Sequence, residues 1–239
     1  MTREERLNRT AMLYTPAQME RLKNAHVLLL GLGGVGGHAA EALARSGVGR
    51  LTVVDSDTVA PSNLNRQLAA LESTVGRSKV EVMCARLRDA APDAQICGIE
   101  AFYLPESPVP LPPDCTVVAD AIDTVAAKLH LARACRDMGV PLVSCMGMGN
   151  RLDPAQIRVG DIFETSGCPL CRVMRRELRR MGVPALRCVY SLEPAMTPQI
   201  PEGAETKGGR PAPGSVSFVP AAAGLFLAGE AVRIIAGDR

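Results

Sequence analysis

Hydrophobic and polar positions form two kinds of block along the first 150 residues. Short runs that are apolar throughout predict strands covered on both faces of a sheet. They span residues 26–31, 50–55, 94–100, 115–120 and 142–146. Between them, amphipathic segments predict helices over 39–45, 78–91 and 124–138. Because strand, helix and strand alternate, we expect parallel strands with right-handed crossovers in a Rossmann-like, doubly wound α/β sheet.

The pattern changes after residue 150. Residues 156–162 alternate between apolar and polar and predict an antiparallel strand, while 167–181 predict a strongly basic helix. The stretch 193–220 is rich in proline and glycine and predicts a long loop, of a length that is typical of functional loops. The chain ends in an apolar helix over 221–235, and its first 22 residues predict a short basic helix or arm. We therefore expect a mostly parallel sheet with antiparallel additions in the second half.

Composition indicates an ordinary folded, soluble chain, with 47% hydrophobic and 22% charged residues among 239. The most apolar long window, 220–237, is interrupted by Glu230 and Arg233, so we expect no membrane contact. Eight cysteines lie mostly singly in apolar segments, and the charged start lacks the apolar run of a signal peptide. These features predict a cytoplasmic protein. The net charge of +2 means that any nucleic-acid contact must come from a local patch.

A glycine-rich loop follows the first predicted strand and opens a helix. Its glycines are Gly31, Gly33, Gly34 and Gly36. Glycine lets backbone N–H groups approach phosphate oxygens at a helix N-terminus, where negative charge is favoured. Asp55 ends the next strand, where a carboxylate can accept hydrogen bonds from ribose hydroxyls. The spacing predicts a nucleotide site, and by motif frequency alone a dinucleotide oxidoreductase is the default interpretation.

The polar residues that follow favour phosphate chemistry instead. Arg66 and Lys79 can stabilise charge on departing pyrophosphate, and Asp123, at a strand end, can hold Mg²⁺. A hydride-transfer site needs an apolar slot for nicotinamide and gains nothing from these three groups together. Singly, Asp57 is also typical of a turn, Arg66 of a surface cation and Lys79 of a solvated first turn. In this order, together with Asn63, they favour ATP.

Together these residues resemble the ubiquitin-activating-like superfamily, which includes the ThiF, MoeB and HesA families. Its members adenylate a carboxylate with ATP. The motifs that carry the resemblance are the glycine loop 31–36, Asp55 and Asp57, Asn-Leu-Asn-Arg-Gln at 63–67, Lys79 and Asp123. The resemblance implies an ATP site formed by Gly33, Asp55, Asn63, Arg66, Lys79 and Asp123.

The N-terminal segment adds a further implication. Arg9 resembles the arginine with which members of this superfamily reach the ATP site of the partner subunit. The resemblance therefore implies a homodimer in which Arg9 acts in trans. It extends over nearly the whole chain, so we expect one domain over 1–239, with a nucleotide-binding half, 1–150, and a substrate-facing half, 151–239.

The cysteines bear on which carboxylate is activated. Members of the superfamily that activate sulfur carriers typically carry two C-x-x-C pairs that bind structural zinc. This chain has one pair, Cys168 and Cys171, with Cys188 as an isolated third thiol, which is short of four tetrahedral ligands. We therefore favour ordinary thiols at a helix start over a zinc site. A redox pair is less favoured still, because no thioredoxin-like context surrounds it.

Five arginines of the predicted helix 167–181 follow the spacing i, i+3, i+4, i+7 and i+8, which places them on one face. They are Arg172, Arg175, Arg176, Arg179 and Arg180. Glu177 is the one acidic residue beside them, and Met174, Leu178 and Met181 form the opposite, apolar stripe. Because such a face repels itself without an anionic partner, we predict that it contacts RNA phosphates.

Segments 161–180, 189–194 and 214–220 resemble the tRNA threonylcarbamoyladenosine dehydratase branch of the superfamily. The resemblance implies ATP-dependent cyclisation of threonylcarbamoyladenosine in tRNA, through an acyl-adenylate on the threonyl carboxylate. AMP and pyrophosphate leave, and because attack is intramolecular no catalytic cysteine is required. We expect the loop 193–220 to guide substrate or exclude water.

Two alternatives differ in the substrate or in the class of protein. One is an adenylyltransferase that activates the C-terminal glycine of a small sulfur-carrier protein, and the other is a nucleotide-binding scaffold without catalysis. The scaffold is disfavoured because the phosphate-cleaving residues are all present. A sulfur-transfer protein as a further partner stays open, as do the preferred tRNAs, the ring form of the product and a monovalent-ion site.

Overall fold

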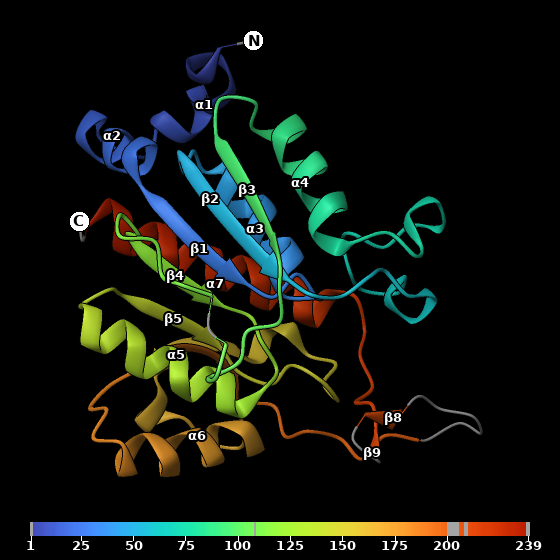
Figure 1. Cartoon of the computed structure of the whole chain (residues 1–239). Helices are drawn as coiled ribbons and strands as arrows, with labels where there is room; N and C mark the ends of the chain where they lie inside the picture. The colour runs from blue at the N-terminus through green and yellow to red at the C-terminus, as the bar shows by residue number, and fades with distance from the viewer. Residues whose placement is uncertain (1, 108, 200–205, 208–209, 238–239) are drawn as a thin grey trace.

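The computed structural model describes residues 2–107, 109–199, 206–207 and 210–237. The strands within them are β1 (His26–Leu30), β2 (Arg50–Asp55), β3 (Gln95–Glu100), β4 (Val117–Asp120), β5 (Leu142–Cys145), β6 (Ile157–Asp161), β7 (Arg187–Ser191), β8 (Thr206–Lys207) and β9 (Arg210–Pro211). The first seven form one sheet in the order β3-β2-β1-β4-β5-β7-β6, and β8 pairs with β9 (Figure 1). All pairs within the large sheet are parallel except β6 with β7. The predicted fold class is confirmed.

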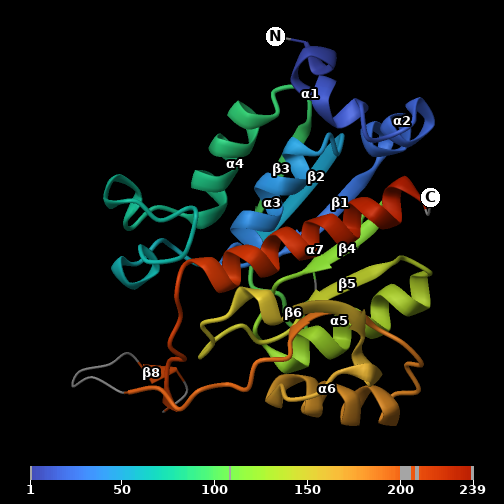
Figure 2. The same cartoon turned by 180° about the vertical axis from the view of Figure 1, so that it is seen from behind.

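Helices cover both faces of the sheet. They are α1 (Arg3–Ala11), α2 (Pro16–Asn24), α3 (Gly36–Arg45), α4 (Lys79–Ala90), α5 (Val125–Met138), α6 (Pro169–Arg180) and α7 (Phe218–Ala236). Short 3-10 turns span Pro61–Asn63, Glu72–Thr74, Pro154–Gln156 and Ile162–Glu164. Figure 1 shows α5 and α6 in front of the sheet, and Figure 2, from behind, shows α3, α4 and α7 on the other face.

Strand β1 shows why the predicted strands are apolar throughout. Val27 and Leu29 pack into the core beneath α3, α4 and α7, whereas Leu28 and Leu30 pack into the core beneath α5. Successive side chains of a strand point to opposite faces, so a strand between two helix layers must be apolar at every position.

Strand β7 was not predicted from the pattern, and neither was the β8–β9 pair, which lies within the predicted loop 193–220. Strand β7 lies between β5, to which it is parallel, and β6, to which it is antiparallel. The run is short and has Arg187 and Ser191 at its ends, so its apolar character is too brief to distinguish from a loop. The predicted antiparallel strand 156–162 is confirmed as β6, which pairs with β7. The N-terminal arm consists of two helices, α1 and α2.

Helix α7 is long and apolar enough, by length and composition, to cross a membrane. In this fold it lies across the sheet beside α3, where a Cβ on Gly224 would come within 2.3 Å of the carbonyl oxygen of Val35 (Figure 2). Its acidic residue, Glu230, is paired with Arg187 at 2.6 Å and with Arg233 at 2.7 Å. The apolar residues of α7 therefore pack into the hydrophobic core of the fold.

Candidate nucleotide-binding site

A cavity of about 560 Å³ lies at the carboxyl ends of β1, β2, β4 and β5. The chain runs outward from β1 through β2 to β3, and then returns to build β4 and β5 on the other side of β1. Loops leave such a switch point in opposite directions and open a crevice, which is where ligands bind in open α/β sheets. Most of the predicted ATP-site residues line this cavity: Gly31, Gly33, Gly34, Asp55, Asp57, Asn63, Arg66, Lys79 and Asp123.

The glycine loop fits a phosphate group. Gly31 has a φ of +90°, and a Cβ there would lie 2.8 Å from the carbonyl oxygen of Ala121. A Cβ on Gly33 would meet nothing within 4 Å, so this backbone borders open space. No described side chain caps the first turn of α3, which leaves its N–H groups for an anion. Gly36 differs from the prediction, because it is buried behind the loop, where a Cβ would lie 1.8 Å from the Gly31 oxygen.

The two aspartates after β2 have different surroundings. Asp55 accepts hydrogen bonds from the backbone N–H of Leu32 at 2.5 Å and of Asp57 at 2.8 Å, which fixes its carboxylate beside the glycine loop. Asp57 instead pairs with Lys79, whose Nζ lies 2.8 Å from Oδ2. The Lys79 side chain is 5% exposed and that of Asp57 is 62% exposed. The ammonium is therefore held at the cavity wall by a carboxylate that faces solvent.

The segment 63–67 contributes Asn63, Arg66 and Gln67 to the lining of the cavity. Asn63 is buried, and its Oδ1 accepts the N–H of Ala60 at 3.1 Å, so it shapes the turn. Arg66 donates through Nη1 to the carbonyl oxygen of Ser62 at 2.9 Å and to Oδ1 of Asn65 at 2.8 Å. Oε1 of Gln67 is buried and has no hydrogen-bond partner among the described residues, although Gln67 lines the cavity. A ligand that donates a hydrogen bond would satisfy this oxygen.

The described end of the predicted loop 193–220 is tied down beside the cavity. Asn65 donates through Nδ2 to the carbonyl oxygen of Ser215 at 3.0 Å. Asn150, at a positive φ of 59°, exchanges two hydrogen bonds of 2.7 Å with the backbone of Gly214. Pro213 and Ser215 line the cavity. The remainder of the predicted loop includes 200–205 and 208–209, which lie outside the described residues.

A buried ion pair between Lys128 and Asp120, which the sequence did not reveal, fixes the turn that carries Asp123. Lys128 of α5 places Nζ 2.8 Å from Oδ2 of Asp120, and both side chains are fully buried. Ser144 donates to the same carboxylate oxygen at 2.5 Å, and Oδ1 of Asp120 accepts the N–H of Ile122 at 2.9 Å. This network fixes the turn after β4 that carries Asp123, an exposed residue of the cavity wall. The sequence feature that could have indicated this ion pair is Lys128 itself, a lysine among the buried residues of α5.

The described residues contain no group of three or more His, Cys, Asp and Glu side chains that could hold a metal ion. Asp123 lines the cavity, and its Oδ1 atom lies 3.4 Å from Oγ1 of Thr124. Protein-bound Mg²⁺ commonly takes one or two carboxylates and completes its shell with water and substrate phosphates. One carboxylate beside a phosphate-binding loop fits that mode of binding.

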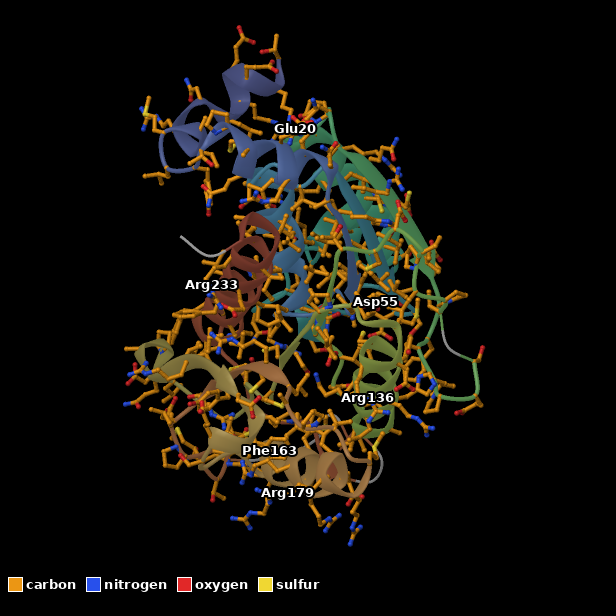
Figure 3. All side chains as sticks on the ribbon, turned by 90° about the vertical axis from the view of Figure 1, so that its left-hand side faces the viewer. Glu20, Asp55, Arg136, Phe163, Arg179 and Arg233 are labelled. Atoms are coloured by element: carbon orange, nitrogen blue, oxygen red, sulfur yellow. The ribbon has the colours of Figure 1, made fainter. Side chains whose placement is uncertain are left out.

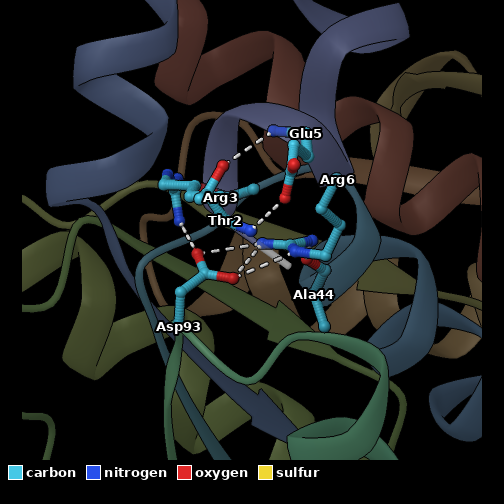
Figure 4. A network of polar contacts seen from close by, with 7 residues as sticks. Thr2, Arg3, Glu5, Arg6, Ala44 and Asp93 are labelled. Atoms are coloured by element: carbon cyan, nitrogen blue, oxygen red, sulfur yellow. Dashed lines mark hydrogen bonds and ion pairs between the residues drawn. The ribbon is translucent and has the colours of Figure 1, made fainter.

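Arg9 is exposed in the last turn of α1, and it does not line the cavity of its own chain. Helices α1 and α2 precede the amino end of β1, at the edge of the sheet opposite the cavity (Figure 1). The helix α1 is fastened by Asp93, which pairs with Arg3 and, at 2.7 Å, with Arg6 (Figure 4). Arg9 therefore lies away from the nucleotide cavity of its own chain.

The arginines of α6 divide into two groups. Arg172, Arg176, Arg179 and Arg180 are exposed. Arg175 departs from the prediction of one open face, because it is half-buried and donates to the carbonyl oxygen of Thr165 at 2.9 Å. Arg179 lies 5.1 Å from the ring centre of Phe163, at the outer edge of the molecule and away from Asp55 (Figure 3). Leu170, in the first turn of the same helix, lines the cavity, so α6 runs from the cavity to the surface.

Comparisons with known proteins agree with this geometry. The model of the ThiF family matches residues 7–239. The tRNA threonylcarbamoyladenosine dehydratase of Bacillus subtilis is 38% identical over 229 residues, which cover 92% of this chain and 90% of that protein. The molybdopterin-synthase adenylyltransferase of Salmonella typhimurium is 36% identical over 170 residues, 71% of this chain and 65% of that protein.

Among solved structures, the tRNA N6-threonylcarbamoyladenosine dehydratase of Escherichia coli superposes with a TM-score of 0.85, both in complex with AMP and in complex with ATP. The sequence identities are 33% and 32%, and each match covers 97% of this chain and 94% of the other.

Proposed function

This chain belongs to the ThiF family, and from that premise we propose that it uses ATP to cyclise threonylcarbamoyladenosine in tRNA, with loss of water. The reaction adenylates the threonyl carboxylate and releases pyrophosphate. A nucleophile within the same modified base then attacks the acyl carbon, closes the ring and releases AMP. The enzyme is thus an ATP-dependent dehydratase of the ligase type.

One observation carries the proposal: Arg66, Lys79 and Asp123 converge on the cavity whose floor is the glycine loop. Transfer of a nucleotidyl group needs cations where negative charge develops and a carboxylate for the metal that accompanies the phosphates. The relatives of Bacillus subtilis and Escherichia coli that match over most of this chain carry the dehydratase name, and the latter binds ATP and AMP.

The geometry divides the work among the residues. The glycine loop and the first turn of α3 hold phosphate oxygens, and Asp55 accepts from the ribose hydroxyls. Lys79 and Arg66, which both line the cavity, stabilise the charge that builds on the pyrophosphate as it leaves. Asp123 would hold Mg²⁺, and the ion would neutralise negative charge on the phosphates.

The substrate end of the cavity lies toward the second half of the chain. Residues 145–149, after β5, line it together with Leu170 and Pro213. These groups are mostly apolar, which suits a site that must keep water away from a reactive acyl-adenylate. The exposed arginines of α6 begin at Arg172, two residues beyond Leu170, and give the surrounding tRNA phosphates a cationic surface. We propose that the modified base enters along this helix.

The catalytic unit in this proposal is a homodimer. Arg9 of one copy supplies a further cation to the phosphates bound by the other, as its place at the opposite edge of its own sheet requires. The short anchor through Asp93 makes α1 a fixed arm, so that Arg9 is presented in a defined position.

A second candidate activates the C-terminal glycine of a sulfur-carrier protein, since a molybdopterin-synthase adenylyltransferase also matches 71% of this chain. The test is exchange of labelled pyrophosphate into ATP, measured with tRNA that carries threonylcarbamoyladenosine and with purified carrier proteins. Stimulation by the modified tRNA supports the dehydratase. Stimulation by a carrier alone would replace it with the second candidate, while the adenylation site would stand.

A further inference from the structure

Arg151 is a buried cation without a carboxylate partner among the described residues. It is 3% exposed, and it lies on the segment after β5 that borders the cavity. Its guanidinium donates to three carbonyl oxygens, those of Glu193 at 3.0 Å, of Gly149 at 3.3 Å and of Gly147. Its Nη2 is buried and makes no hydrogen bond within the described residues. A buried charge that meets neutral acceptors alone is costly, so this site favours an anion.

The group that can supply this anion is Cys168. It is 3% exposed, and its sulfur would lie 3.9 Å from a Cβ placed on Gly147, the residue whose carbonyl oxygen accepts from Arg151. Cys168 is the N-cap residue of α6, a helix of 12 residues, so its side chain lies beside the N–H groups of the first turn. An N-cap acceptor normally satisfies such an N–H group, and a thiolate satisfies it better than a thiol. The helix terminus and the guanidinium therefore favour the same charge state.

Two neighbouring thiols and the pKa values agree with this arrangement. Hydrogen bonding from the Cys171 thiol and N–H, together with Arg151, lowers the pKa of Cys168 to about 5 despite burial. The bond to Cys168, burial and the nearby charge raise the pKa of Cys171. Cys145 and Cys188 also face this sulfur, and burial raises the pKa of each to about 12, so they remain neutral.

We propose that Cys168 and Cys171 form a peroxide-reactive dithiol, in which Cys168, which lies near Arg151, is the attacking sulfur and Cys171 the resolving sulfur. The sequence favoured ordinary thiols because it does not show that Arg151 lies against the pair. The Cβ atoms of residues three apart on a helix lie about 5–6 Å from each other. A disulfide needs about 3.5–4.5 Å, which a small shift of the first turn supplies.

The chemistry balances with hydrogen peroxide as the oxidant. The Cys168 thiolate attacks one peroxide oxygen, the O–O bond breaks, and Cys168 becomes a sulfenic acid while hydroxide leaves. The Cys171 thiol then displaces water from that sulfur, and the S–S bond forms. Overall the two sulfurs lose two electrons, and the peroxide is reduced to one water and one hydroxide, which solvent protonates.

A small oxidant has a short route to the sulfur. Gly147 and Leu170 line the cavity, and a Cβ placed on Gly147 would lie 3.9 Å from Sγ of Cys168. The sulfur thus lies behind a wall of glycine backbone, which carries no side chain to block it.

The first test uses the pH dependence of alkylation. The reduced full-length protein is treated with iodoacetamide from pH 6 to 8, and the rate at each cysteine is followed by peptide mass spectrometry, with exposed Cys97 as the internal reference. A thiolate gives a Cys168 rate that changes less than about twofold over this range, whereas an ordinary thiol gains about tenfold per pH unit. Arg151→Met should restore the steep dependence. A steep dependence in the unaltered protein would overturn the proposal.

The second test identifies the products and does not depend on the Arg151 variant folding. With hydrogen peroxide, the peptide that contains both cysteines should lose two hydrogens. In Cys171→Ser the sulfenic acid should persist on Cys168 and be trapped by dimedone. Cys145→Ser, a neighbouring buried thiol, is the matched control and should react like the unaltered protein. Absence of a dimedone adduct on Cys168, or stoichiometric zinc that is lost in Cys168→Ser, would contradict the dithiol.

Discussion

The Nζ atom of Lys79 lies 2.8 Å from Oδ2 of Asp57, and the backbone N–H of Lys79 donates to the carbonyl oxygen of the same aspartate at 3.0 Å. These two contacts join the first turn of α4 to the loop after β2. They hold a nearly buried ammonium at the wall of the nucleotide cavity, in the place where a departing pyrophosphate would need it. The lysine is prepositioned, so little reorganisation accompanies catalysis.

Replacement of Lys79 tests that role. Lys79→Ala should lower the rate of AMP formation by about 10²–10³-fold, because one preorganised group that stabilises developing charge is removed. Arg77→Ala is the matched control, since this nearby exposed cation is paired with Glu81 at 2.6 Å. The measurement is AMP released in the presence of modified tRNA. Equal rates for the two variants would exclude Lys79 from the site.

Asp123 is predicted to act through the metal. Asp123→Asn keeps the shape of the side chain but removes the charge, so AMP formation should fall sharply and require a higher concentration of Mg²⁺. Titration of Mg²⁺ against the initial rate measures both effects. Asp137→Asn, an exposed aspartate of α5, should leave the titration unchanged. An unaltered Mg²⁺ requirement in Asp123→Asn would remove Asp123 as the ligand.

The action of Arg9 in trans predicts complementation between two inactive variants. Arg9→Ala and Lys79→Ala should each be inactive alone. When they are unfolded and refolded together, half of the dimers are mixed, and each mixed dimer has one complete site. The recovered rate should then approach about a quarter of the normal rate. If mixing restores nothing, while each variant remains dimeric, Arg9 does not serve the partner's site.

The basic helix predicts how tRNA binding depends on salt. Simultaneous replacement of Arg172, Arg176, Arg179 and Arg180 by Gln should weaken binding and reduce the slope of log K against log salt by about 3. Filter binding at several salt concentrations gives this slope.

Arg175 distinguishes an exposed arginine from a structural one. Arg175→Gln should leave the salt slope nearly unchanged and lower thermal stability, because it donates to Thr165 instead of facing solvent. A loss of slope from Arg175 alone would contradict the division of the arginines proposed for α6.

The buried pair below Asp123 predicts a loss of stability. Lys128→Met leaves the Asp120 carboxylate buried without its ammonium, which should lower the free energy of unfolding by about 3–5 kcal/mol. Denaturation by urea, followed by circular dichroism, measures the change. Lys23→Met, at an exposed lysine, should have little effect. A Lys128→Met protein as stable as the unaltered chain would show that the pair does not support this turn.

The sequence predicted the structure well where the conformation of a segment depends on the residues of that segment alone. Strand β2 has the predicted bounds, 50–55, because its four central residues are buried and three of them, Leu51, Val53 and Val54, are apolar. Gly139 ends α5 as predicted, in the left-handed conformation at φ +67°, which glycine adopts without strain. Gly31, Asp55 and Asp123 were identifiable because each stands at or just after the end of a parallel strand, whereas Asn63, Arg66 and Lys79 were identified by the family resemblance.

The sequence was less informative where a property depends on two distant segments. Lys128 finds Asp120 and Ser144 across two strands, and Arg151 finds Cys168 across β6, so neither pair has a spacing that could reveal it. Helical periodicity likewise placed Arg175 on the same face as the exposed arginines of α6. In the structure its side chain is half-buried because it donates to the carbonyl oxygen of Thr165, in the preceding turn. Strand β7 was missed because its place between β5 and β6 is a matter of topology and not of pattern.

The most direct test of the proposed function is the fate of the modified nucleoside. Purified protein is incubated with Mg-ATP and tRNA that carries threonylcarbamoyladenosine, and the nucleosides are then analysed by mass spectrometry while AMP is measured in parallel. We predict that the nucleoside loses the mass of one water, with one AMP formed for each nucleoside converted. An unchanged nucleoside under conditions in which the protein still makes AMP would contradict the dehydratase.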